Sequence, residues 1–328
     1  MNSAQLLEIE DLRVVFHGDR RPTHAVDRVG LTLARGATLG IVGESGCGKT
    51  VTSLAIMGLL ARPAAEVSGT VRFDGIDLLQ IAESKLNDLR GNRLAMIFQE
   101  PMTSLNPSYT IGEQIIETIA RHRGGSRGAA RTRAIDMLHR VRMPSPEHRL
   151  DEYPHRLSGG LRQRAMIAMA LACDPQLLIA DEPTTALDVT IQAQILDLMR
   201  QLKATTGAAI ILITHDLGVV AEICDEVAVM YAGEIVERAP VDVLFERPEH
   251  PYTVGLLGAI PRLDRRADKL AVIEGMVPNM TAPPVGCRFA SRCPFADARC
   301  RAERPPVVSL GGGRWSRCFY APLERLVQ

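Results

Sequence analysis

The sequence predicts an α/β fold with a mostly parallel sheet, and three observations support this prediction. Short apolar runs of strand length alternate with segments of helical periodicity through much of the chain. A glycine-rich loop at residues 43–50 stands between one apolar run and a helical segment, which is the context of a phosphate-binding loop. Cysteine, proline and glycine are frequent near the C-terminus, which indicates a small extension to the main domain.

The N-terminal part predicts strands around the glycine-rich loop. Residues 6–16 alternate apolar and polar side chains, which indicates an edge strand. The pair Asp74-Gly75 after a short apolar run predicts a β-hairpin, and we expect an antiparallel β subdomain here. The expected elements are strands at 31–33, 39–42, 71–73 and 94–98 and a helix at 49–60.

A helical pattern runs from about residue 111 to 172 and predicts an inserted helical subdomain, placed at about 100–172. Beyond it strands and helices alternate again. We expect strands at 177–180, 208–214 and 226–231, helices at 191–205 and 217–224, and then a short strand after 234 and helices at 241–246 and 252–260. The expected division is a nucleotide-binding domain at 1–240 and an extension at 241–328.

Composition narrows the function. Basic and acidic residues balance at 38 each and aromatic residues make up 4%, so we expect no nucleic-acid partner. No apolar stretch is long enough to cross a bilayer, and acidic residues interrupt the N-terminus where a secretion signal would be apolar. A cytosolic location is therefore expected, and any membrane role must come through partner subunits.

The loop Gly43-Glu44-Ser45-Gly46-Cys47-Gly48-Lys49-Thr50 has the spacing of a phosphate-binding loop. Its glycines let backbone N–H groups turn toward an anion, and the following helix presents its positive end. Lys49 is expected to contact the β- and γ-phosphates of ATP, and the Thr50 hydroxyl to bind Mg²⁺. The alternative is a chance glycine-rich turn before a helix.

Asp181 and Glu182 end an apolar strand. The aspartate can hold the hydration shell of Mg²⁺, and the adjacent glutamate can polarise the water that attacks the γ-phosphate. Two carboxylates after a strand are otherwise common as helix caps.

These motifs, together with Leu157-Ser158-Gly159-Gly160-Leu161, resemble the nucleotide-binding subunits of ABC transporters over roughly residues 5–240. The resemblance implies an ABC ATPase core. It implies that Gln99 touches Mg²⁺ or the attacking water, that His215 contacts the γ-phosphate, and that Asp188 communicates across a dimer. Phe16 is the choice for the aromatic residue that stacks on adenine, with His24 as the alternative.

Ser158 and Gly160 match the family's signature, which contacts the γ-phosphate of ATP held by the opposite subunit. A serine hydroxyl, glycine amides and a helix start together make a second anion site. This half-site has no lysine and no Mg²⁺ ligand, so it works only against a partner's phosphate loop. Leu161 departs from the glutamine that the family usually has there, which leaves the serine and the glycines intact.

The tail carries Cys287, Cys293, Cys300 and Cys318 with the spacing Cys-x5-Cys-x6-Cys-x17-Cys. Structural zinc sites favour closer pairs, so an iron–sulfur cluster is preferred over Zn²⁺, with four free thiols as the remaining alternative. The other cysteines, Cys47, Cys173 and Cys224, are read as small buried residues. Because Cys47 lies in the phosphate loop, its modification is expected to block ATP binding.

The tail also resembles the C-terminal region of oligopeptide and dipeptide importer ATPases, at residues 249–253, 256–261 and 286–294. Upstream, residues 98–107 resemble the same subfamily. The resemblance implies an ATPase that powers import of di- or oligopeptides from the cytoplasmic face of the membrane, and a [4Fe-4S] cluster in the tail. It implies as partners a homologous second ATPase, two transmembrane permease subunits and an extracytoplasmic peptide-binding protein. The alternatives are a nickel importer of the same subfamily and a soluble ABC ATPase of DNA repair or ribosome recycling.

Overall fold

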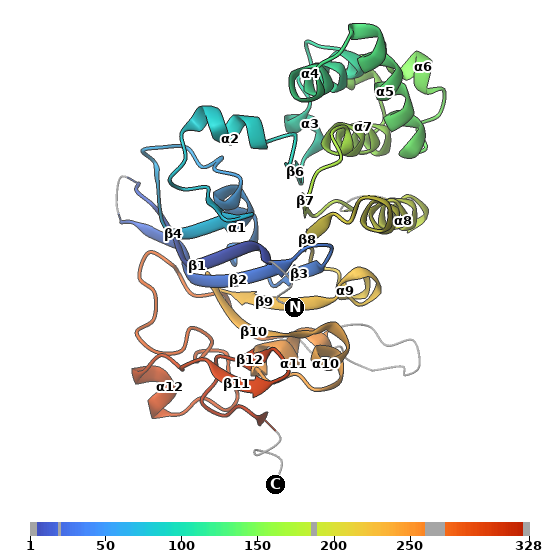
Figure 1. The fold of residues 1–328 in the computed structure, drawn as a ribbon. Coiled ribbons are helices and arrows are strands. Elements are labelled where there is room, and N and C mark those ends of the chain that lie inside the picture. Colours follow the sequence, from blue (N-terminus) through green and yellow to red (C-terminus); the bar gives the residue numbers. More distant parts are fainter. Residues whose placement is uncertain (1–4, 19–20, 185–188, 260–272, 324–328) are drawn as a thin grey trace. The chain divides into compact units, whose positions relative to one another are not determined.

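The computed structural model describes residues 5–18, 21–184, 189–259 and 273–323 (Figure 1). The chain divides into two compact units. The first unit contains residues 1–6, 33–37 and 80–213, and the second contains residues 7–32, 38–79 and 214–328. Among the described residues no helix has the length and hydropathy needed to cross a membrane.

Three parallel strands form the centre of the first unit: β6 (Leu94–Ile97), β7 (Leu177–Asp181) and β8 (Ala209–Ile213), with β7 in the middle. Every residue of these strands is buried, as their continuous apolar runs require. The predictions of strands at 94–98, 177–180 and 208–214 are confirmed. Asp181 is the last residue of β7, so the sheet carries this carboxylate to its C-terminal edge.

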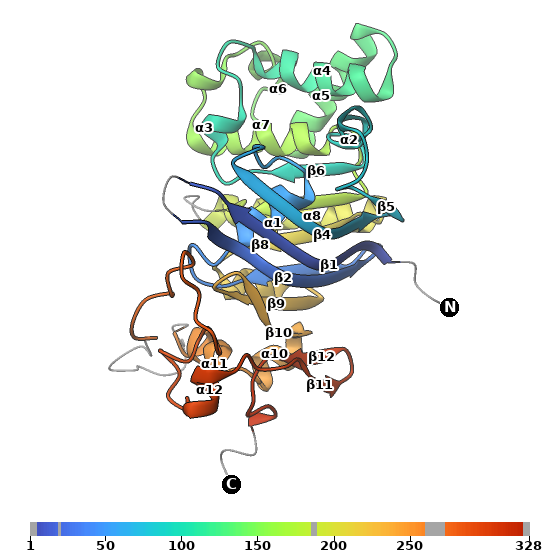
Figure 2. The same cartoon turned by 90° about the vertical axis from the view of Figure 1, so that its left-hand side faces the viewer.

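Helices make up most of the rest of the first unit, and α3 to α7 gather into one group in both views (Figures 1 and 2). A capping box begins α4, because Thr110 accepts from the Glu113 amide and Glu113 accepts from the Thr110 amide. The helical pattern predicted over 111–172 is confirmed. The helices are α2 (Glu83–Leu89), α3 (Pro101–Ser104), α4 (Ile111–Arg123), α5 (Arg127–Arg140), α6 (Pro146–Arg149), the 3₁₀ turn η1 (Pro154–Arg156), α7 (Gly159–Leu171) and α8 (Val189–Thr206).

An antiparallel sheet, most of whose residues belong to the second unit, confirms the predicted β subdomain. It contains β1 (Gln5–Phe16), β2 (Thr23–Ala34), β4 (Ala65–Phe73) and β5 (Ile76–Asp77) in the order β2-β1-β4-β5. The hairpin at Asp74-Gly75 is confirmed, since Phe73 pairs with Ile76. The prediction of an edge strand at 6–16 is wrong, because β1 lies between β2 and β4. Alternation of apolar residues reports which face of a strand is covered and not how many neighbours the strand has.

The second unit also contains the strand that leads into the phosphate loop. This strand, β3 (Thr38–Val42), pairs in parallel with β9 (Glu226–Tyr231), and β10 (Glu234–Pro240) continues the sheet antiparallel to β9. The hairpin of β11 (Val308–Gly311) and β12 (Arg314–Ser316) extends it through β12. The sequence did not predict this hairpin, whose turn is rich in glycine. The helices of the unit are α1 (Lys49–Ile56), α9 (Leu217–Ile223), α10 (Val241–Glu246), α11 (Pro251–Gly258) and α12 (Ala298–Ala302).

Helix α1 is shorter than the predicted helix at 49–60. It ends at Ile56 because Gly58 has φ +64° and the Leu59 amide donates back to the Leu54 carbonyl at 2.9 Å. This backward hydrogen bond beyond a left-handed glycine is the Schellman termination of a helix. Gly58 was therefore a signal in the sequence that the helical periodicity obscured.

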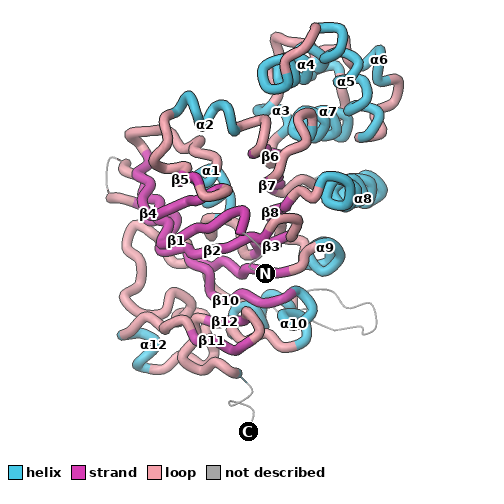
Figure 3. Tube along the Cα trace, in the orientation of Figure 1, coloured by secondary structure: helices cyan, strands magenta, loops and turns pink. Residues whose placement is uncertain are grey.

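Buried ion pairs fix the C-terminal extension, whose described residues 273–323 are mostly loop (Figure 3). The Arg288 side chain is 4% exposed and pairs with Asp27 of β2 at 2.5 Å and with Glu234 of β10 at 2.9 Å. Arg304 pairs with the same two carboxylates. Burial lowers the pKa of Arg288, and the charge of Asp27 opposes that shift. Since a buried carboxylate that loses its partner is costly, the extension is integral to the second unit.

Candidate functional site

The phosphate loop joins β3 to α1 in the second unit, and its geometry requires glycine at both ends. Gly43 has φ +152°, and a Cβ there would lie 2.1 Å from the Met230 carbonyl oxygen. Gly48 has φ +105°, and a Cβ there would lie 2.6 Å from the Ala25 carbonyl oxygen. The two glycines therefore let the loop pass directly against β9 and β2.

Lys49 lies inside this loop and is 6% exposed. Its ammonium group donates to the Gly43 carbonyl at 2.7 Å and to the Glu44 carbonyl at 3.0 Å. Ser45 and Gly46 are exposed at the crest of the loop, and the Thr50 side chain is half-buried on the first turn of α1. Backbone amides, one cation and a hydroxyl thus gather at a helix N-terminus, an arrangement that suits a polyphosphate.

Cys47 is completely buried beneath the loop, which confirms the prediction that it is a small buried residue. Burial raises the pKa of its thiol, and the nearby Lys49 charge opposes that rise. A reagent can therefore reach this thiol only when the loop opens. Cys173 and Cys224 are buried as well, as predicted.

The second unit also holds the predicted adenine-stacking and γ-phosphate residues. Phe16 is half-buried at the end of β1, and the His24 amide, on β2, donates to the Met280 carbonyl at 3.0 Å. His215 is exposed in the turn before α9, where Asp216 caps the helix by accepting from the Gly218 amide at 2.9 Å. The contacts of Phe16 and His215 with a nucleotide stay predictions.

The predicted catalytic carboxylate lies in the first unit, at the C-terminal edge of the sheet. Asp181 is 1% exposed at the end of β7. Glu182 follows in the left-handed region at φ +47°, and its amide donates to the Ile213 carbonyl at 2.8 Å. The Gln99 amide group donates to the Glu182 carboxylate at 3.1 Å, so the structure brings these two predicted residues together. Backbone strain of this kind is typical of functional residues.

Ser158 begins α7, also in the first unit. Its side chain is exposed and makes no capping hydrogen bond, and Gly159 after it is exposed too. The hydroxyl therefore faces outward beside the first amides of a 13-residue helix, where an anion from another molecule can reach both. Gly160 is half-buried in the first turn. The predicted communication residue Asp188 lies outside the described residues.

One link between these parts of the first unit was not predicted from the sequence. Gln163 of α7 is 3% exposed, and its amide group donates to the Pro183 carbonyl at 2.7 Å, directly after Glu182. Helix α7 is thus hydrogen-bonded to the loop that carries the predicted catalytic carboxylate. The only sequence signal was a polar residue on the buried side of an apolar helix.

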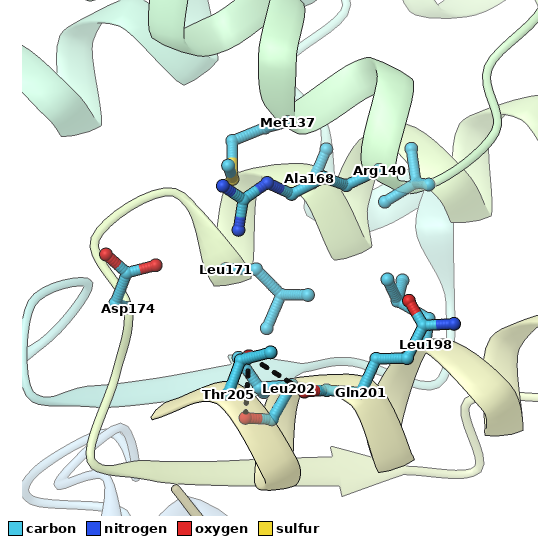
Figure 4. Close-up of a pocket in the computed structure, with 10 residues that line it drawn as sticks. Met137, Arg140, Ala168, Leu171, Asp174, Leu198, Gln201, Leu202 and Thr205 are labelled. Atoms are coloured by element: carbon cyan, nitrogen blue, oxygen red, sulfur yellow. Dashed lines mark hydrogen bonds between the residues drawn. The ribbon is translucent and has the colours of Figure 1, made fainter. Parts of the chain in front are cut away.

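A pocket of about 350 Å³ lies elsewhere in the first unit, between α5, α7 and α8 (Figure 4). Leu171 and Leu202 contribute apolar side chains to its lining, and Arg140 and Asp174 contribute charged ones. None of the predicted site residues lines it, so this pocket is separate from the candidate nucleotide site.

The four cysteines of the tail all line one small cavity in the second unit. The Cys287 amide donates to the Cys300 carbonyl at 2.8 Å, which holds two of them together. Burial raises the pKa of Cys287 and of Cys318 to about 11, and neighbouring cysteines add to the rise. The cavity measures only about 10 Å³, and no group of three or more His, Cys, Asp or Glu among the described residues is placed to hold one metal ion.

Comparison with known proteins gives the family. The ABC transporter family matches residues 26–185, and the oligopeptide/dipeptide transporter C-terminal region matches residues 236–300. The dipeptide transport ATP-binding protein DppD of Escherichia coli is 51% identical, over 97% of this chain and 97% of that protein. The chain belongs to the ATP-binding proteins of the oligopeptide/dipeptide type of ABC transporter.

Other relatives agree with this assignment. A probable peptide ABC transporter ATP-binding protein of Sinorhizobium fredii, y4tR, is 53% identical over 96% of this chain and 94% of that protein. An ATP-binding cassette solved as a dimer in a post-hydrolysis state with ADP and Pi has a TM-score of 0.65 and 26% identity, covering 72% of this chain and 98% of its own. The predictions of an ABC ATPase fold and of ATPase activity are confirmed. The phosphate loop of this ABC ATPase belongs to the second unit, and Asp181 and Glu182 belong to the first.

Proposed function

We propose that this chain is the ATP-hydrolysing subunit of an importer of di- or oligopeptides. The observation that carries the proposal is the phosphate loop, with Lys49 buried in it at 6% exposure, in a chain whose C-terminal part matches the oligopeptide/dipeptide transporter region. The names of the relatives supply the transported class, since DppD is a dipeptide transport protein and y4tR a probable peptide transport protein.

The site residues divide the chemistry among them. Lys49 and the loop amides bind the β- and γ-phosphates of ATP, and Phe16 stacks on the adenine. Glu182 acts as the general base toward the attacking water. Gln99 orients the Glu182 carboxylate through the 3.1 Å hydrogen bond that it donates. His215 contacts the γ-phosphate. Thr50 and Asp181 offer the hard oxygen ligands that Mg²⁺ prefers, and this ion would neutralise phosphate charge.

The signature half-site requires a second ATPase subunit. Ser158 and the first amides of α7 act on the γ-phosphate of ATP held by that partner, and the partner's signature acts on the ATP held here. Closure of the two subunits around nucleotide, and reopening after hydrolysis, drives the transport cycle. A homologous ATPase is the proposed partner.

Two transmembrane permeases and an extracytoplasmic peptide-binding protein complete the proposed importer. The chain would sit peripherally on the cytoplasmic face of the membrane and dock through its helical region, about residues 100–172, and the segment near Gln99. We place the nucleotide-binding domain at residues 1–240 and the extension at 241–328. The matched transporter region begins close to this boundary, at residue 236.

Peptide uptake by the assembled complex tests the proposed function. In proteoliposomes that contain the full complex, Lys49→Ala is expected to abolish ATP-dependent uptake of a labelled di- or tripeptide, because the loop loses its cation. Lys85→Ala, at an exposed lysine of α2, is the matched control and should transport normally. A purified complex without membrane subunits, or uptake that survives Lys49→Ala, would contradict the proposal.

The cysteine cavity is proposed to hold a [4Fe-4S] cluster. Four cysteines converge on it, and thiolates are the ligands of such clusters. Structural zinc sites favour closer cysteine pairs than this tail has, so a cluster is preferred over Zn²⁺. Because the cavity measures about 10 Å³, the four thiols must move apart to accept a cluster. The cluster would crosslink a tail with little apolar core.

Iron and acid-labile sulfide test this second proposal. Full-length chain purified without oxygen is expected to contain about four of each per molecule, and Cys293→Ser is expected to lose them. Cys173→Ser is the matched control, since that cysteine is buried outside the cavity. One zinc per chain without sulfide, or no metal at all, would contradict the cluster.

A further inference from the structure

The segment between the first two tail cysteines reaches from the cysteine cavity into the core of the second unit. Phe289 is 2% exposed and packs against Tyr231 and Tyr252, with ring centroids 5.2 and 5.4 Å away. Arg288 enters the buried ion pairs with Asp27 and Glu234. These contacts of Phe289 and Arg288 hold the segment in one position, and they thereby fix the direction of the Arg292 side chain.

Arg292 contacts the phosphate loop itself. Its guanidinium donates to both carboxylate oxygens of Glu44, at 2.7 and 2.9 Å. It also donates to the Ile273 carbonyl at 3.0 Å and to the Tyr231 hydroxyl at 3.3 Å. The Arg292 side chain is only 4% exposed and that of Glu44 28%, so this two-pronged ion pair is partly shielded from solvent, which surface ion pairs are not.

Glu44 is held from a second direction. Its backbone amide donates to the Tyr252 hydroxyl at 2.8 Å, and Tyr252 is completely buried in α11. Two residues of the C-terminal part of the chain therefore hold Glu44. Arg292 binds its carboxylate, and Tyr252 binds its backbone amide. They lie 248 and 208 positions away from it in the sequence.

The contact between Arg292 and Glu44 also changes the charge of the phosphate loop. Glu44 follows Gly43 directly, so a carboxylate lies within the loop that must accept the negative charge of a triphosphate. Without a cationic partner, that carboxylate would repel the phosphates, because the two negative charges would lie close together in partly buried surroundings. Arg292 cancels its charge with a group that stays cationic at any physiological pH.

We propose that Arg292 and Tyr252 are positioning residues of the ATP site, through which the C-terminal extension neutralises Glu44 and fixes the start of the phosphate loop. The inference rests on the proposed function only in that ATP binds this loop, and it is independent of the transported substrate. Neither residue touches the nucleotide; both act through Glu44.

Equilibrium binding of Mg-ATP and of ADP to the full-length chain tests the proposal. Arg292→Gln is expected to raise the Kd for ATP about tenfold and the Kd for ADP less, because ATP carries the larger negative charge. The double variant Glu44→Gln with Arg292→Gln is expected to bind ATP within about threefold of wild type, since the opposing carboxylate is gone. Tyr252→Phe keeps the buried ring and should weaken ATP binding about threefold by removing one hydrogen bond.

Two controls separate the possible outcomes. Arg131→Gln removes another arginine that binds both oxygens of a carboxylate, that of Asp151, in the helical part of the first unit, and should leave ATP affinity unchanged. Lys49→Ala should lose ATP binding; if it does not, the loop is not the ATP site and the proposed function itself is wrong. If Arg292→Gln binds ATP like wild type, or if removing Glu44 as well restores nothing, the positioning role is overturned.

Discussion

Glu182→Gln is expected to lower ATP turnover by at least about a hundredfold while leaving ATP binding unchanged. Glutamine has nearly the shape of glutamate but cannot accept a proton from water. The structure makes the carboxylate well placed for that role, since Glu182 follows the buried Asp181, has φ +47° and accepts a hydrogen bond from Gln99 at 3.1 Å. The backbone that holds it, including the hydrogen bond from the Glu182 amide to the Ile213 carbonyl, does not depend on the side chain.

Turnover must be measured in the complex with the partner's own ATP site inactivated, so that only the site containing Glu182 contributes. ATP binding is measured on the same sample, and the closed ATP-bound form is expected to accumulate. Glu117→Gln, an exposed glutamate of α4, is the matched control for the change in charge. Normal turnover by Glu182→Gln in this arrangement would show that another group activates the water.

The fold was predictable where its causes are local. The strands β6, β7 and β8 follow from apolar runs that only a doubly covered sheet can bury, and α10 was predicted with its observed bounds, Val241–Glu246. The errors have non-local causes. The place of β1 inside its sheet depends on β2 and β4, and β12 forms a strand because β10 offers it a free edge.

The candidate site divides in the same way. Motif spacing located the loop, the carboxylates and the signature, because each is a short segment with its own geometry. The family resemblance assigned Gln99 to Mg²⁺ or the attacking water, but its contact with Glu182, 83 positions away in the chain, was not predicted. Arg292 and Tyr252 lie in segments that carry the family resemblance, but nothing in the sequence pointed to their contacts with Glu44, because these depend on the folding of the extension against the core of the second unit.

The half-site at the start of α7 allows an experiment that separates folding from function. Ser158→Asp places a carboxylate at the N-cap, where aspartate is among the preferred residues and where the helix dipole favours negative charge. The present serine makes no capping hydrogen bond, so the free energy of unfolding should stay the same or rise. The same carboxylate would repel the phosphates of a nucleotide presented by a partner.

Ser158→Asp is therefore expected to reduce ATP turnover by the assembled complex about a hundredfold, with unchanged ATP binding by the variant chain alone. The loss of turnover should fall on the composite site that contains the partner's phosphate loop. Turnover by that site alone is measured after the site that contains Lys49 has been inactivated. Ser126→Asp makes the identical change at the N-cap of α5, where the serine accepts from the Ala129 amide at 3.2 Å, and should leave turnover intact. If both variants behave alike, Ser158 is only a helix cap; if only Ser158→Asp fails, its hydroxyl serves a nucleotide that another subunit holds.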